Sequence, residues 1–214
     1  MTLTASTQQR LPSKELSTSY SENTSLALET LHNRLNQMEG KIGVLDLGRP
    51  CNANVQFFSQ FSCKLHIVDL YSFFNEMNGV VAHDEVRLLE VEKYVEQHIL
   101  TQQNVEFDVI LVWDLMNYME KNLLQTFFKV IIKYCHKGTL LFVLNASQQL
   151  IPNNPSFYKI VRPDCLGCEQ ETVSWTQSPR LTPGDLQRFL PGFVVYRSFL
   201  LKSGMQEILF EYAN

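Results

Sequence analysis

Short apolar runs alternate with amphipathic stretches along most of this chain. Nearly continuous apolar runs predict strands at 42–48, 64–70, 107–115 and 139–145. Apolar residues at helical spacing predict helices over 25–39, 54–61, 86–101 and 120–138. The alternation predicts parallel strand–helix–strand units, whose right-handed crossovers place helices on both faces of one sheet. We therefore assign the chain to the α/β class.

The C-terminal part carries a different pattern. Thr182 is placed as a helix N-cap, Pro183 as the first helical residue and Pro191 as a stop signal, which predicts a short capped helix. Two strand-like runs follow, on either side of Lys202-Ser203-Gly204. Their short connection predicts a hairpin, so an antiparallel pair closes the sheet.

Two segments fall outside this regular pattern. Residues 1–24 are rich in Ser, Thr and Gln, and we expect a flexible tail before a single domain over 25–214. Residues 148–181 form a connection long enough to be a lid, a binding loop or a disordered segment. Four of its side chains are candidates to line a ligand pocket: Tyr158, Arg162, Trp175 and Arg180.

Three predicted strands end on an acid. Asp46 closes the first strand beside Gly48, Asp69 closes the second, and Asp114 closes the most apolar strand. In an open α/β sheet, ligands bind outside the carboxyl ends of the strands, where the strand order reverses. An acid about 20 residues beyond a glycine loop suits the two hydroxyls of a ribose. Asp is also a common helix cap, so a structural role for each acid remains open.

The order of elements and four sequence segments resemble class I S-adenosylmethionine (SAM)-dependent methyltransferases. The segments are VLDLG, HIVDL, FDVILVWDLMNYM and the closing GMQEILFEY. The resemblance covers residues 25–214 and implies a doubly wound, mostly parallel, seven-stranded Rossmann-like sheet with a C-terminal antiparallel hairpin. It also implies SAM as cofactor and transfer of a methyl group to an unidentified acceptor.

The resemblance gives roles to particular residues. The cofactor-binding set comprises Asp46, Gly48, Asn54, Asp69 and Asp84. Asp69 holds the ribose, Asp84 or its neighbour Glu85 lies near the adenine, and the helix opening near Asn54 receives the carboxylate. The catalytic set comprises Asp114, Asn117 and Tyr118, which orient the acceptor for attack on the methyl group. No metal ligand is assigned.

The cofactor loop departs from the family pattern, in which an acid is followed by Gly-x-Gly-x-Gly. This chain reads DLGRPCNAN, with Pro50 and Asn52 at the second and third glycine positions. Proline fixes φ and removes an amide donor, whereas glycine permits close approach of a ligand. The alternative function is therefore a non-catalytic interaction or regulatory protein that keeps the fold and has lost SAM binding.

Composition narrows the remaining classes. Lys plus Arg total 18 against 22 for Asp plus Glu, so we expect no nucleic-acid partner. No apolar stretch is long enough to cross a bilayer, and the odd set of five cysteines suits a reducing compartment, so we expect a cytoplasmic protein without a membrane partner. Cys165 and Cys168 have redox or zinc spacing, but no second Cys or His pair completes a zinc site, which leaves this as a third hypothesis.

Overall fold

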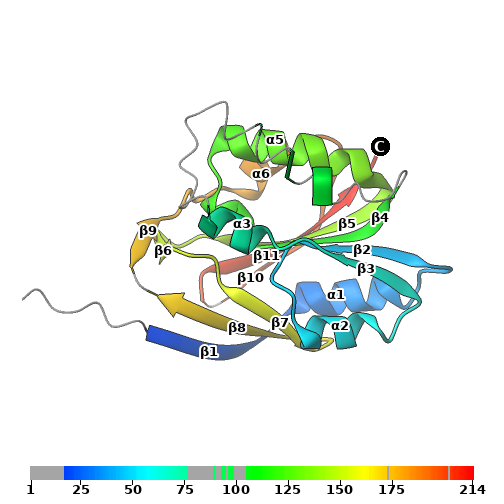
Figure 1. Cartoon of the computed structure of the whole chain (residues 1–214), viewed down its shortest axis with the longest axis horizontal. Helices are drawn as coiled ribbons and strands as arrows, with labels where there is room; N and C mark the ends of the chain where they lie inside the picture. Colours follow the sequence, from blue (N-terminus) through cyan, green and yellow to red (C-terminus); the bar gives the residue numbers. More distant parts are fainter. Residues whose placement is uncertain are drawn as a thin grey trace, which may run out of the picture.

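A six-stranded sheet forms the centre of the computed structural model (Figure 1). The structure describes residues 17–76, 105–172, 174–201 and 203–214, together with Leu89, 93–94 and 96–98. In spatial order the strands are β10 (Phe193–Leu200), β11 (Met205–Tyr212), β5 (Cys135–Ala146), β4 (Phe107–Trp113), β2 (Ile42–Asp46) and β3 (Cys63–Ile67).

The four strands β3, β2, β4 and β5 are parallel, and β11 is antiparallel to β5. The predicted terminal hairpin is confirmed: β10 pairs antiparallel with β11, which lies between β10 and β5. β3 lies on one side of β2 and β4 on the other, so the strand order reverses between β2 and β4. The prediction of seven strands stays a prediction, because residues 77–88 lie outside the described part of the chain.

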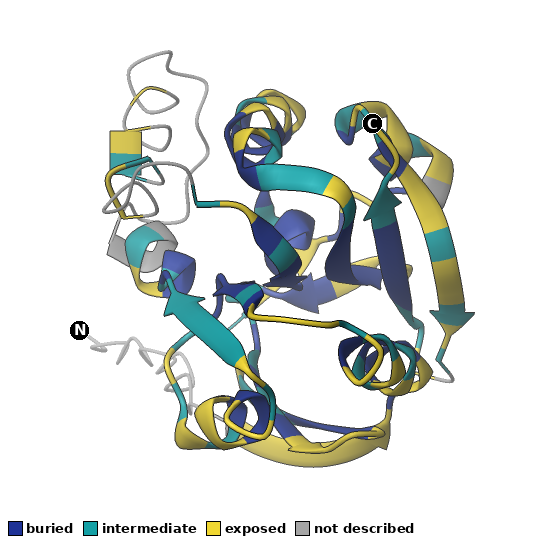
Figure 2. Cartoon of the chain, turned by 90° about the vertical axis from the view of Figure 1, so that its right-hand side faces the viewer, coloured by how far each residue is buried: buried dark blue, intermediate teal, exposed yellow. Residues whose placement is uncertain are grey.

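Helices cover both faces of this sheet (Figure 1). α1 (Leu26–Leu35) and α2 (Asn52–Phe58) contribute to one apolar cluster. α3 (Leu70–Glu76), α5 (Lys121–Ile131) and α6 (Pro183–Phe189) contribute to the other. Residues 109–113 of β4 enter the two clusters in turn, as a strand buried on both faces requires. Figure 2 shows that the buried residues gather on the central strands and on the inward sides of these helices.

Two small sheets lie beside the central one. β1 (Ser17–Thr24), β8 (Cys165–Thr172) and β7 (Phe157–Arg162) form an antiparallel sheet, and β6 (Leu150–Pro152) pairs with β9 (Trp175–Gln177). The long connection after β5 is therefore built of strands. The expectation of a flexible tail is wrong for residues 17–24, because their backbone pairs along its whole length with β8.

Two boundaries differ from the sequence prediction. The helix predicted over 120–138 ends at Ile131, and a 3-10 turn, η2 (Ile132–Tyr134), leads directly into β5. Gly138 lies within β5 and has φ +93°, a conformation that favours glycine. The helix predicted over 86–101 falls largely outside the described residues. No helix in the part of the chain that the structure describes is both long and apolar enough to cross a membrane.

Candidate ligand-binding site

The carboxyl ends of β2 and β4 lie at the point where the strand order reverses. Asp46 is the last residue of β2, Trp113 is the last residue of β4, and Asp114 follows it. In open α/β sheets this point is the crevice in which ligands bind. The side chains of these residues therefore decide what the crevice can hold.

Asp46 is 1% exposed and is fully engaged by the protein. Its Oδ1 accepts hydrogen bonds from the Gly48 amide at 2.9 Å and from the Trp113 indole Nε1 at 2.7 Å. Its Oδ2 accepts one from the Asn54 side-chain amide at 3.1 Å. Burial raises the pKa of Asp46, and the three donors act against that rise. Both carboxyl oxygens of Asp46 thus accept hydrogen bonds from other groups of the protein.

Trp113 fills the space above Gly48. A Cβ added to Gly48 would lie 2.7 Å from the indole Nε1 and 2.9 Å from Cδ1, so only glycine fits at this position. The indole is 1% exposed and lies parallel to the Tyr158 ring, with centroids 5.7 Å apart. Trp113 holds this place with φ +56°, a region that non-glycine residues seldom adopt. The glycine that the sequence shares with the family pattern accommodates the chain's own tryptophan.

Asn54 attaches the small sheet to the same place. Besides donating to Asp46, its side-chain oxygen accepts the amide of Ile160 in β7 at 2.9 Å. Asn54 is buried on the first turn of α2. Asn54, which was expected to lie at a cofactor, therefore links β7 to the carboxyl end of β2.

Asp69 acts as a helix cap in the structure. Its carboxylate accepts the Ser72 amide at 2.9 Å and the Ser72 hydroxyl at 2.8 Å, at the start of α3. Beside it, the Arg49 guanidinium lies 5.6 Å from the centre of the Tyr71 ring. Asp84, expected near an adenine, lies outside the described residues.

These contacts decide whether the residues at the crevice fit SAM. A cofactor held by the first loop needs open space above Gly48 and free polar groups beside it. Here Trp113 occupies the space, and Asp46 and Asn54 bind each other and β7. In this arrangement the methionine end of SAM could reach Gly48 only if the Trp113 indole moved.

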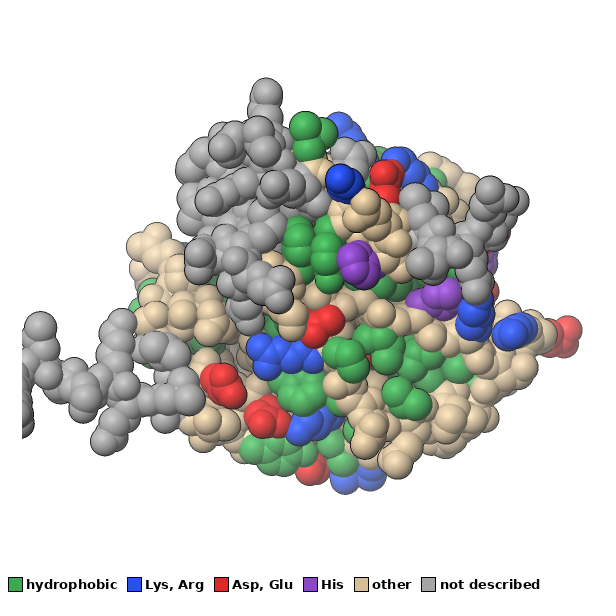
Figure 3. Space-filling model, in the orientation of Figure 1, with side chains coloured by type: hydrophobic (Ala, Val, Ile, Leu, Met, Phe, Trp, Pro, Cys, Tyr) green, Lys and Arg blue, Asp and Glu red, His purple; other side chains and the backbone are tan. Residues whose placement is uncertain are grey.

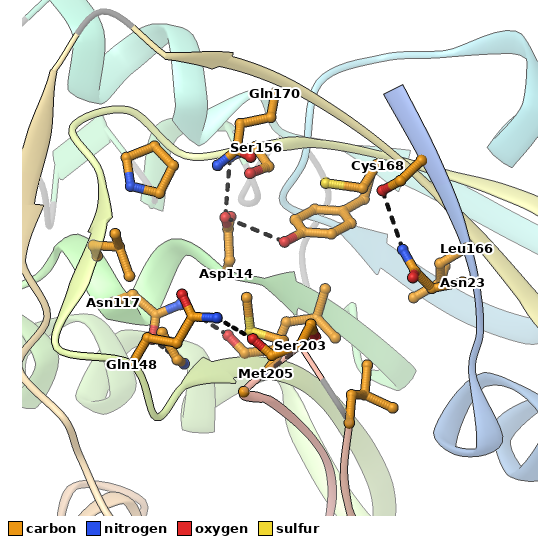
Figure 4. A pocket seen from close by; sticks show the side chains of 18 of the residues that line it. Asn23, Asp114, Asn117, Gln148, Ser156, Leu166, Cys168, Gln170, Ser203 and Met205 are labelled. Atoms are coloured by element: carbon orange, nitrogen blue, oxygen red, sulfur yellow. Dashed lines mark hydrogen bonds between the residues drawn. The ribbon is translucent and has the colours of Figure 1, made fainter. Parts of the chain in front are cut away.

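Asp114 lines a cavity of about 220 Å³ beyond the end of β4 (Figure 4). The cavity is lined by η1 (Leu115–Tyr118), the end of β5, the strands of the long connection, β1 and the start of β11. Exposed side chains form its rim, among them Trp175, Gln148 and Asn23. Buried side chains form its base, among them Asp114 and Glu207.

Three protein groups approach the Asp114 carboxyl group. The Tyr71 hydroxyl donates to Oδ1 at 2.6 Å, and the Ser156 amide donates to Oδ2 at 3.0 Å. The Tyr158 hydroxyl lies 3.5 Å from Oδ2, and Figure 4 shows the contacts with Ser156 and this ring. Burial raises the pKa of Asp114 to about 6, although these donors favour its charged form. Asp114 is therefore a desolvated acid that titrates close to neutral pH.

The two other residues of the predicted catalytic set line the same cavity. The Asn117 amide donates to the Leu144 carbonyl at 3.0 Å and accepts the Ala146 amide at 2.9 Å, so it holds the end of β5. The Tyr118 hydroxyl donates to the Asn154 carbonyl at 3.1 Å. The structure brings Asp114, Asn117 and Tyr118 together, while their part in catalysis stays a prediction.

Several cavity residues escaped the sequence analysis, because β8 and β11 come to the cavity beside Asp114 only in the folded chain. Glu207 of β11 is buried, accepts the Ala27 amide at 3.1 Å, and has a pKa raised by burial. Cys168 of β8 lines the cavity, and burial raises the pKa of its thiol. Of the residues proposed for a pocket, Tyr158 and Trp175 line it, whereas Arg162 is exposed near Glu22 and Asp164.

The structure gives no support to the redox or zinc hypothesis. Cys165 and Cys168 are free thiols on β8. Within the described residues, no group of three or more His, Cys, Asp or Glu side chains is arranged to hold a metal ion.

On the face shown in Figure 3, the coloured Lys and Arg side chains are interspersed with Asp and Glu.

The fold is that of known methyltransferases. No family model matches the chain, and no curated protein sequence matches it. Among solved structures, it is similar to an S-adenosylmethionine-dependent methyltransferase from Clostridium acetobutylicum, with 12% identity and a TM-score of 0.51 over 88% of this chain and 91% of that one. It also matches 1,6-didemethyltoxoflavin-N1-methyltransferase from Burkholderia thailandensis, with 14% identity and a TM-score of 0.47 over 89% and 80% of the two chains. From the first of these similarities and the sheet order, we conclude that the chain has the fold of class I SAM-dependent methyltransferases.

Proposed function

We propose that this chain is a binding protein built on the methyltransferase fold, which holds a small organic ligand in the Asp114 cavity. In this proposal the Trp113 side chain occupies the place of a cofactor, at the point where the strand order of the sheet reverses. One observation carries the proposal: the Trp113 indole lies over Gly48 and donates to Asp46, which closes the crevice from inside. The fold alone does not decide activity, because one fold hosts many functions.

The energetics of the closed crevice support this proposal. For SAM to enter in the usual orientation, the indole must leave a position in which it is 1% exposed and hydrogen-bonded. A hydrogen bond to a charged group contributes roughly 1.5–3 kcal/mol, and removing a buried tryptophan side chain costs about 3–5 kcal/mol. A ligand that displaces Trp113 loses a comparable part of its binding free energy.

A SAM-dependent methyltransferase is the second candidate. Its support is the fold, together with the position of Asp114, Asn117 and Tyr118 around one cavity at the carboxyl ends of the strands. The positive φ of Trp113 also favours this candidate, because strained backbone conformations cluster at active sites and at segments that change conformation. This function requires a second arrangement of Trp113 in which Gly48 is uncovered.

Calorimetric titration with SAM and with S-adenosylhomocysteine separates the two candidates. For the binding protein, the wild-type chain gives no binding heat at millimolar concentration of either compound. Trp113→Gly is the companion variant, because it empties the crevice and relieves the positive φ. Gain of SAM binding in this variant alone would show that Trp113 closes a latent site. Micromolar binding by the wild-type chain would overturn the proposal and favour the methyltransferase.

A further inference from the structure

The charged side chains that line the Asp114 cavity, among the described residues, are all acidic. Its described lining residues include two buried acids, Asp114 and Glu207, and no Lys, Arg or His. Buried carboxylates in proteins are normally paired with a cation or a metal ion, because desolvation strongly disfavours an isolated charge. Asp114 has only neutral donors around it, namely Tyr71, Ser156 and Tyr158. Among the described lining residues, no cation balances the Asp114 carboxylate.

The walls of the cavity indicate the rest of the ligand. Three aromatic rings line it, from Tyr118, Tyr158 and Trp175, and aromatic faces attract organic cations as well as apolar groups. Aliphatic and thioether side chains also line the cavity: Leu144, Ile151, Leu166, Leu201 and Met205. The neutral polar side chains of the lining include those of Ser21, Asn23, Gln148 and Gln170. The cavity volume of about 220 Å³ is below the roughly 300–1,000 Å³ of sites for drug-sized ligands. The ligand that fits is small and has an apolar or aromatic part.

We propose that this cavity binds a small organic cation, a protonated amine on an apolar or aromatic body, with the ammonium group at Asp114. The inference rests on the proposed function, since it names the ligand class of the same cavity. Glu207 adds a second negative charge to the base, although the start of α1 partly neutralises it through the Ala27 amide. An anion of the same size meets two acids without a compensating cation.

The titratable groups around Asp114 make the binding depend on pH. Tyr71 from α3, Tyr118 from η1, Tyr158 from β7 and Cys168 from β8 all have raised pKa values, so they stay neutral near pH 7. Glu207 from β11 is the other acid at the cavity, and burial also raises its pKa. Because the pKa of Asp114 is about 6, the amine affinity rises about tenfold between pH 5 and pH 7.5 as Asp114 loses its proton.

The test compares three probes of one shape by calorimetry at pH 7.5: phenethylamine, the neutral 2-phenylethanol and the anionic phenylacetate. We expect phenethylamine to bind about 10- to 100-fold more tightly than 2-phenylethanol, the range of a charge-assisted hydrogen bond, and phenylacetate not to bind. Asp114→Asn removes most of this preference. Asp164→Asn is the matched control, because it removes the same charge from an exposed side chain outside the cavity.

Two outcomes overturn the inference. Equal binding of the amine and the alcohol by the wild-type chain shows that the cavity does not select a cation. No binding of phenethylamine at millimolar concentration shows that the cavity takes another class of ligand. The first outcome needs no variant, so it stands even if Asp114→Asn fails to fold. The proposed function fails separately, through SAM binding to the wild-type chain.

Discussion

Gly48 and Trp113 form a pair whose coupling is measurable. If Gly48 is glycine because the indole lies against it, Gly48→Ala is costly only while Trp113 is present. In the wild-type chain the new Cβ lies 2.7 Å from Nε1 and 2.9 Å from Cδ1, so the ring must shift. Forcing extra atoms into a packed site costs about 1–3 kcal/mol. Alanine also lowers the conformational entropy of the unfolded chain, which offsets about 0.4–1 kcal/mol of this cost.

In a Trp113→Ala background those two contacts disappear. The remaining near contact is Asp46 Oδ1 at 3.1 Å, a separation that needs a shift of only a few tenths of an ångström. Gly48→Ala is then expected to leave the free energy of unfolding unchanged or to raise it slightly. The coupling energy between the two sites is therefore about 1–3 kcal/mol.

Urea unfolding followed by circular dichroism measures all four proteins of this cycle. Gly184→Ala in α6 is the matched control, because its new Cβ has no atom closer than 3.8 Å. We expect this control to raise stability by about 0.5–1 kcal/mol in both backgrounds. Equal destabilisation by Gly48→Ala with and without Trp113 would refute the idea that the tryptophan is what Gly48 accommodates.

Two further predictions concern the acids at the strand ends. Burial raises the pKa of Asp114 from 3.8 to about 6, so the folded state keeps a proton that the unfolded chain releases near pH 4. The free energy of unfolding therefore falls by about 2 kcal/mol between pH 4 and pH 7 through this group. Asp114→Asn removes that part of the pH dependence, while the parts from Asp46 and Glu207 remain; parallel stability curves for the two proteins in urea titrations would contradict this. Asp69→Ala is expected to cost about 1 kcal/mol, or roughly 2–4 °C in thermal melting, because it removes the cap that Asp69 provides at Ser72. It leaves phenethylamine affinity unchanged, and a tenfold change in that affinity would assign Asp69 to the ligand site instead.

The sequence predicts the central fold well because that part depends on local patterns. Apolar runs mark the parallel strands, and the Thr182 cap with Pro183 marks α6, whose capping box the structure confirms. β1 is missed because its sequence STSYSENT has no apolar alternation. Its place comes from pairing with β8, about 140 residues further along the chain, which no local pattern reports.

The candidate site is likewise only partly predictable from local sequence patterns. The three strand-end acids are visible in the sequence, and the geometry of an α/β sheet brings Asp46 and Asp114 to one edge. What each acid contacts is not visible. The closure of the crevice depends on the φ of Trp113 and on a hydrogen bond between residues 67 positions apart. The departure from the glycine pattern at Pro50 and Asn52 was the sequence signal that pointed toward this result.

The Trp113 indole N–H reports on the crevice directly. The chain has two tryptophans, and Trp175 is 59% exposed, so a ¹⁵N NMR spectrum compared with that of Trp175→Phe assigns the Trp113 signal. We expect this N–H to be protected from hydrogen exchange by its bond to Asp46 and to keep its position when SAM is added to millimolar concentration. A saturable shift of the Trp113 signal with SAM, or loss of its protection, would contradict the claim that this tryptophan occupies the place of the cofactor.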